Sequence, residues 1–170
     1  MKLTLGLDAS TTVIGWSFYD PESKKILGAG FVDISKKETN KEKAFFFIEF
    51  ITKNPLIKEV SKITMESALM GFTSGFTKQQ TIVLLARWNG IFEYILSEHF
   101  KMNITLVNVN TARKKVFGKC RVKGIPAKEY VKMSIPNVVP YISDFEVKNK
   151  KGAPDKRNAD VYDAIVISMY

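Results

Sequence analysis

The sequence has very few of the side chains that form disulfides or bind soft metals. Its 170 residues include one cysteine, Cys120, and one histidine, His99. A lone cysteine excludes an intrachain disulfide, and one cysteine with one histidine cannot supply the four protein ligands of a structural zinc site. The composition therefore fits a reducing compartment, which we expect to be the cytoplasm.

Long hydrophobic runs are also missing. No stretch approaches the roughly 20 apolar residues of a membrane span, and Asp8 interrupts the first apolar stretch too early for a signal peptide. We therefore expect no membrane partner. Because 45% of the residues are apolar, the chain can bury a substantial core, and its length favours one domain over residues 1–170.

Acidic residues are in deficit. The chain has 17 Asp and Glu against 26 Lys and Arg, a formal net charge of +9. This excess favours a polyanionic partner, nucleic acid before an anionic membrane surface. Residues 113–132 contain a single acid, Glu129, and eight basic residues: Arg113, Lys114, Lys115, Lys119, Arg121, Lys123, Lys128 and Lys132. This density favours phosphate contacts, and a solvated helix face is the alternative.

Four of the scarce acids lie in core-like sequence. Asp8 and Glu66 each end an apolar run, and Asp160 and Asp163 stand three apart in a segment rich in apolar residues. Because an unpaired buried charge is costly, acids in such positions favour a functional role. Taken singly, each has a structural alternative: a turn acid at a strand end, a charge on an edge strand or a solvated helix face.

The apolar pattern predicts an α/β fold. We expect strands over residues 2–8, 13–20, 25–34, 60–66 and 103–109, and helices over 40–53, 77–99, 111–117, 126–134 and from 158 onward. Asn40 is expected to cap the first helix, and residues 146–158 to form a flexible loop. The first three strands form an antiparallel meander in a mixed sheet flanked by helices. Acids at strand ends would then meet at one edge of the sheet.

Carboxylates gathered at one edge suit metal-dependent phosphate chemistry. Phosphodiester hydrolysis needs a nucleophilic water and a stabilised leaving oxyanion, and two divalent ions about 3.5–4 Å apart supply both. Mg²⁺ prefers oxygen ligands and keeps several waters, so a few carboxylates suffice. Asp160 and Asp163 are spaced i,i+3 and would project from one helix face. The joint pattern predicts a metal site at the four acids.

Several motifs along the chain resemble those of one known family. They are Gly6-Leu7-Asp8-Ala9-Ser10 with Gly15-Trp16, Ile63-Thr64-Met65-Glu66-Ser67, the stretch from Gln79 to Gly90, Val116-Phe117-Gly118 with Ala127-Lys128, and Ala159-Asp160-Val161-Tyr162-Asp163-Ala164. Together they resemble the RuvC family of Holliday junction resolvases, within the ribonuclease-H-like superfamily. The resemblance covers nearly the whole chain and implies a five-stranded mixed sheet of that type.

The resemblance also implies an activity. By position, Asp8, Glu66, Asp160 and Asp163 become ligands of two Mg²⁺ ions, with Mn²⁺ as a substitute, and Lys128 lies near the scissile phosphate. The implied enzyme cuts four-way DNA junctions to leave a 5′-phosphate. It is a homodimer whose subunits meet through the long helix 78–99, and a two-fold dimer matches a junction with two strands to cut.

The sequence departs from the family in two places. Ser10 stands where the bacterial enzymes usually have glycine, and the loop after Glu66 differs. Leu69 by position and Phe72 by chemistry are the candidates for the apolar residue that wedges into the junction, with core packing as the alternative. The divergent loop and short chain suggest a phage or viral protein, acting in the cytoplasm of a bacterial cell or an infected host cell.

The sequence leaves three alternatives to a junction resolvase. A nuclease of the same fold could cut flaps, forks or other branches. A nucleotide-binding protein of the actin and sugar-kinase type has an opening like residues 8–12, but it predicts a second glycine-rich phosphate loop and a larger chain, and the sequence has neither. A non-catalytic DNA-binding module predicts that replacing the acids changes no activity.

Overall fold

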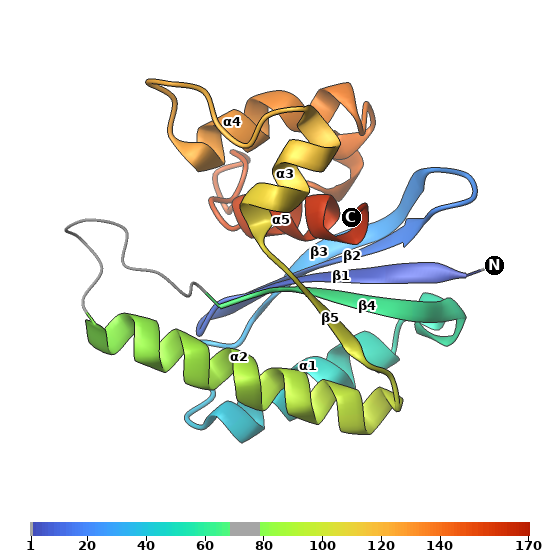
Figure 1. The fold of residues 1–170 in the computed structure, drawn as a ribbon, viewed down its shortest axis with the longest axis vertical. Helices are drawn as coiled ribbons and strands as arrows, with labels where there is room; N and C mark the ends of the chain where they lie inside the picture. The colour runs from blue at the N-terminus through green and yellow to red at the C-terminus, as the bar shows by residue number, and fades with distance from the viewer. Residues whose placement is uncertain (1, 69–78) are drawn as a thin grey trace.

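A five-stranded mixed sheet forms the centre of the protein (Figure 1). The computed structural model describes residues 2–68 and 79–170. The spatial order is β3 (Lys25–Asp33), β2 (Val13–Asp20), β1 (Leu3–Ala9), β4 (Val60–Glu66) and β5 (Ile104–Val107). The pairs β1–β2 and β2–β3 are antiparallel, whereas β1–β4 and β4–β5 are parallel. The predicted mixed sheet with an antiparallel opening is confirmed.

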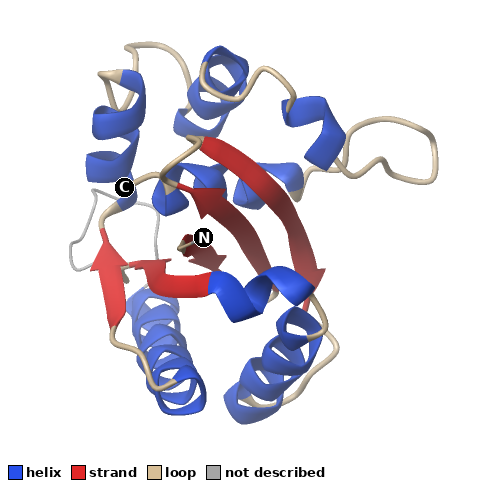
Figure 2. Cartoon of the chain, turned by 90° about the vertical axis from the view of Figure 1, so that its right-hand side faces the viewer, coloured by secondary structure: helices blue, strands red, loops and turns tan. Residues whose placement is uncertain are grey.

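Helices cover both faces of the sheet (Figure 2). On one face lie α1 (Asn40–Thr52) and α2 (Gln79–Phe100), and on the other lie α3 (Val109–Phe117), α4 (Ala127–Ser134) and α5 (Asn158–Ser168). Short 3₁₀ helices span Pro55–Glu59, Ile135–Asn137 and Ile142–Phe145. Each face has its own apolar core. Within the described residues, no helix is long and apolar enough to cross a membrane.

The last helix, α5, lies directly on the backbone of β1 and β2. A Cβ atom on Gly15 would be 2.1 Å from the carbonyl oxygen of Asp160, and one on Gly6 would be 2.4 Å from that of Ala164. Real Cβ atoms do not approach backbone so closely, so only glycine permits this packing. These two glycines therefore determine how closely the first turns of α5, which carry Asp160, approach the sheet.

Replacing Gly15 with alanine should destabilise the protein and displace Asp160. The new methyl group would meet backbone, so β2 or α5 must move, at a cost of about 3 kcal/mol and a Tm lower by roughly 6–12 °C. Thermal unfolding measures this change. Gly28→Ala is the matched control, because its Cβ would meet only side-chain atoms, at 3.6 Å or more. Equal Tm values for the two variants would contradict the close packing.

Several boundaries differ by one or two residues from the sequence prediction, and two of these differences have a clear cause. The cap of α1 is Thr39 rather than Asn40, because the Thr39 side chain and Glu42 form a reciprocal capping box. The strand predicted over 103–109 is shorter, since Asn108 leaves the sheet and accepts hydrogen bonds from the first backbone N–H groups of α3. The predicted start of the long helix at Thr77 lies outside the described residues.

The polar segment before α5, predicted to be a flexible loop, forms a hairpin with defined hydrogen bonds. We call residues 146–157 the basic hairpin. Lys148 pairs with Pro154 in a β-bridge, which brings the two arms together. At its base, the side-chain amide of Asn158 makes two hydrogen bonds of 3.0 Å with the backbone of Val147, one as donor and one as acceptor. The hairpin is thus fixed to the first turn of α5.

Arg157 fixes the hairpin to the sheet as well. Its guanidinium donates to the two carboxylate oxygens of Asp155 at 2.9 and 2.7 Å, and to Asp33 of β3 at 2.9 Å. The same group lies 4.4 Å from the ring centroid of Phe31. The hydrogen bonds from Arg157 lower the pKa of Asp155 to about 2.

Replacing Asp155 with asparagine should lower Tm at pH 7 by roughly 2–4 °C. The carboxylate has a lower pKa in the folded protein than its ordinary value of 3.8. Its contribution to stability is therefore complete above about pH 4 and is lost as the pH falls through the folded value. Melting curves between pH 7 and pH 2 should show the two proteins converging at low pH. A difference that is constant with pH would contradict this ionic role.

Candidate active site

The four acids predicted from the sequence border one pocket. Its volume is about 250 Å³, and its charged walls are Asp8, Glu66, Asp160, Asp163, Arg113 and Lys128. We call it the acidic pocket. The structure therefore brings the acids of β1, β4 and α5 together, as the sequence predicts.

Strand order explains how the acids meet. In the parallel pair β1–β4, Leu7 lies opposite Met65. The next residues, Asp8 near the end of β1 and Glu66 at the end of β4, therefore lie at the same edge of the sheet. Asp160 and Asp163 lie on successive turns of α5, which the glycine contacts place over β1 and β2. Each acid comes from an element whose position the sheet fixes.

Asp8 is buried among the other three acids of the pocket, and its pKa reflects this. Burial raises its pKa well above the ordinary value, and the neighbouring charge of Glu66, with smaller effects from Asp163 and Asp160, raises it further. Asp8 is also within hydrogen-bonding reach of Glu66. Like charges held together in this way would be stabilised by a cation.

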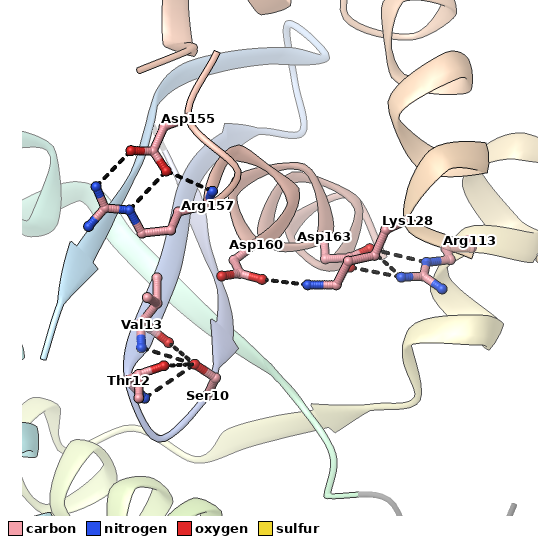
Figure 3. Close-up of polar contacts among 9 residues, drawn as sticks. All are labelled: Ser10, Thr12, Val13, Arg113, Lys128, Asp155, Arg157, Asp160 and Asp163. Carbon is pink, nitrogen blue, oxygen red and sulfur yellow. Dashed lines mark hydrogen bonds and ion pairs between the residues drawn. The ribbon is translucent and has the colours of Figure 1, made fainter. Parts of the chain in front are cut away.

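Two protein cations already contact the acids (Figure 3). Arg113 of α3 donates to both carboxylate oxygens of Asp163 at 2.8 Å, and both side chains are buried. Lys128 of α4 donates to Asp160 at 2.9 Å, but its side chain is 64% exposed. Partial burial acts to lower the pKa of Lys128, but the contact with Asp160, together with smaller effects from Asp8 and Asp163, outweighs burial, so the pKa is raised.

The donor chemistry of the acidic pocket fits a divalent metal. Carboxylate oxygens are the ligands that Mg²⁺ prefers, and Asp8 is buried against three other acids. As the side chains stand, no group of three or more acids, histidines or cysteines in the described ranges is arranged to hold an ion. Arg113 and Lys128 hold two of the four carboxylates. The exposed Lys128 can turn to solvent, whereas the buried Arg113 is fixed by packing.

Two further residues of the pocket were missed by sequence reasoning. Asn89 of α2 borders the pocket and donates through Nδ2 to the backbone carbonyl of Glu66 at 3.3 Å. Ser10 also borders it, and its hydroxyl closes the β1–β2 turn through hydrogen bonds of 2.8 and 2.9 Å with the backbone of Val13. The family departure at Ser10 could have drawn attention to that residue. No pattern in the sequence singled out Asn89.

The basic segment 113–132 divides into two kinds of residue. Arg113 is turned inward to Asp163, so in this conformation it is not free to contact phosphate. The other seven are exposed: Lys114, Lys115, Lys119, Arg121, Lys123, Lys128 and Lys132. Their role as DNA contacts stays a prediction. The two wedge candidates, Leu69 and Phe72, lie outside the described residues.

The sheet order and its flanking helices define a ribonuclease-H-like fold, with the acids at the edge where its central parallel strands end. No protein-family model and no curated protein sequence matches the chain. Solved structures do match. RuvC of Thermus thermophilus gives a TM-score of 0.63 at 14% identity, over 98% of this chain and 91% of that one.

Two more solved structures are similar to this chain. Thermus thermophilus RuvC in complex with a Holliday junction substrate gives a TM-score of 0.63 at 14% identity, over 99% of this chain and 91% of that one. The yeast mitochondrial Holliday junction resolvase Ydc2 gives 0.56 at 14% identity, over 98% of this chain and 75% of that one. Structural similarity at 14% sequence identity establishes the fold. The RuvC-like fold predicted from the motifs is therefore confirmed.

Proposed function

We propose that the protein is a metal-dependent endonuclease that resolves Holliday junctions and related branched DNA. The observation that carries the proposal is the meeting of Asp8, Glu66, Asp160 and Asp163 at one pocket, within a fold shared with two junction resolvases. The net charge of +9 supports a polyanionic substrate. The cytoplasm is the compartment that we propose for this activity.

The four acids are the proposed ligands of two Mg²⁺ ions, for which Mn²⁺ would substitute. Asp8, which is central and buried against the other three, would hold metal together with them. When bound, such ions supply an activated water and stabilise the leaving oxyanion. Lys128 turns from Asp160 to the incoming phosphate, where its ammonium offsets the charge of the scissile group.

The proposed enzyme acts as a homodimer that meets through α2. This helix exposes large apolar side chains, including Val83, Leu84 and Tyr94. Tyr94 also lines an apolar hollow of about 520 Å³ shared with Phe45 of α1. Exposed apolar surface of this kind favours a protein interface, and a two-fold dimer suits the symmetric cuts that a junction requires.

A second candidate is a nuclease of the same fold that cuts flaps and forks as well as junctions. The deciding experiment compares labelled four-way junctions, forks, flaps and plain duplex with Mg²⁺, and maps the products at nucleotide resolution. A resolvase should cut the junction at paired positions on opposite strands and leave the duplex intact. Equal cutting of forks and flaps would favour the second candidate. A protein that cuts none of the four would overturn the nuclease proposal.

A further inference from the structure

The basic hairpin presents its lysines to solvent and turns its acids inward. Lys148, Lys150, Lys151 and Lys156 are exposed. The two acids in the same segment have partners in the fold. The carboxylate of Glu146 accepts a hydrogen bond from the Tyr162 hydroxyl, and that of Asp155 is held by Arg157. The fully exposed charged side chains of the hairpin are therefore all lysines.

The hairpin has a defined shape, which distinguishes it from a charged linker. Its turn is closed by the Asn149 side chain, which accepts hydrogen bonds from the backbone N–H groups of Lys151 and Ala153 at 2.8 and 3.3 Å. Gly152 has a φ of 78°, a conformation that favours glycine. Since the base is also fixed, by Asn158 and Arg157, the backbone that carries the lysines is ordered before any partner binds.

Lys128 connects the hairpin to the acidic pocket. It borders the acidic pocket and also a second hollow of about 280 Å³. The other charged residues of that hollow are Glu129 and Lys132 of α4, and Asp155 and Lys156 at the base of the hairpin. Arg157 and Asp160 both lie at the start of α5, as Figure 3 shows. A chain of phosphates leaving the acidic pocket past Lys128 would thus meet Lys132 and then Lys156 before it reaches the outer part of the hairpin.

We propose that the basic hairpin is a second phosphate-binding surface, across which one DNA strand runs after it leaves the acidic pocket. Lys148, Lys150 and Lys151 contact the phosphates of that strand. The inference rests on the proposed junction-cutting function. It adds the path of the DNA next to the cleavage site. Contacts of this kind position the duplex and increase affinity without reading sequence.

The test is the salt dependence of junction binding. All proteins carry Asp8→Asn, so that a fluorescent four-way junction stays intact, and the dissociation constant is measured by anisotropy over a range of salt. The triple variant Lys148→Gln, Lys150→Gln, Lys151→Gln should bind roughly tenfold more weakly at low salt. The slope of log affinity against log salt should fall by about 2–3, since each lost phosphate contact removes about 0.9.

The matched control removes the same charge elsewhere. Lys24 and Lys25 lie at the β2–β3 turn and Lys58 just before β4, all at the end of the sheet away from Asp8. Replacing these three with glutamine should leave the slope as in the parent protein. Equal slopes for the hairpin variant and the parent, or equal losses for both triple variants, would overturn the inference. If the parent protein does not bind the junction, the proposed function itself fails.

Discussion

Asp8→Asn should abolish DNA cleavage and at the same time stabilise the metal-free protein. Asparagine has nearly the shape of aspartate but removes the charge from the acid that is most crowded by other acids. We expect a loss of activity of more than about 100-fold, beyond the range typical for loss of a group that only supports a metal ligand. The Tm without metal should rise, because burial and Glu66 make the Asp8 carboxylate unfavourable.

Cleavage of a four-way junction with Mg²⁺ and thermal unfolding without metal measure the two effects. Asp144→Asn is the control, since Asp144 is an exposed acid away from the acidic pocket. Asp144→Asn should change neither the cleavage rate nor the Tm. An Asp8→Asn protein that cleaves like the wild type would remove Asp8 from the proposed metal site and favour a different catalytic group.

Arg113→Gln should be strongly destabilising, by about 3–5 kcal/mol. Arg113 and Asp163 form an ion pair with three hydrogen bonds, and both side chains are buried. Glutamine would leave the carboxylate of Asp163 buried without a charged partner, which is the costly case for such pairs. Chemical denaturation gives the free energy of unfolding directly.

Arg113→Lys is the matched variant, because it keeps the charge and loses the two-pronged geometry. It should recover part of the lost stability. A free energy of unfolding for Arg113→Gln within about 1 kcal/mol of the wild type would show that the pair contributes little, as exposed ion pairs do.

Lys128→Gln removes the exposed cation of the pocket. It should leave the free energy of unfolding nearly unchanged, because exposed ion pairs contribute little to stability.

Much of the fold could be predicted because its signals are local. The runs that became β1, β2 and β4 are apolar and bounded by turn residues, and their ends placed Asp8 and Glu66 correctly. The capping box of Thr39 and Glu42 was also readable in the sequence. The prediction chose Asn40 because asparagine is itself a favoured cap.

The errors came from contacts between residues far apart in the chain. Composition described the basic hairpin as polar and flexible, but Asn158 and Arg157 hold it through partners on Val147 and Asp33. Arg113 was one of eight basic residues in its segment, and no periodicity marked it as the one that turns inward. Its burial depends on the packing of α3 against α5, which supplies Asp163.

The order of the elements also has a consequence for when the proposed activity can arise during synthesis. β1 finds its partner β2 within a few residues, whereas α5 must dock on Gly6 and Gly15 across a long sequence separation. Two of the four acids belong to α5, so a nascent chain that stops before residue 160 has only half of the set. Long-range contacts of this kind form late in folding. A ribosome-bound fragment would therefore lack the proposed cleavage activity until α5 has emerged and docked.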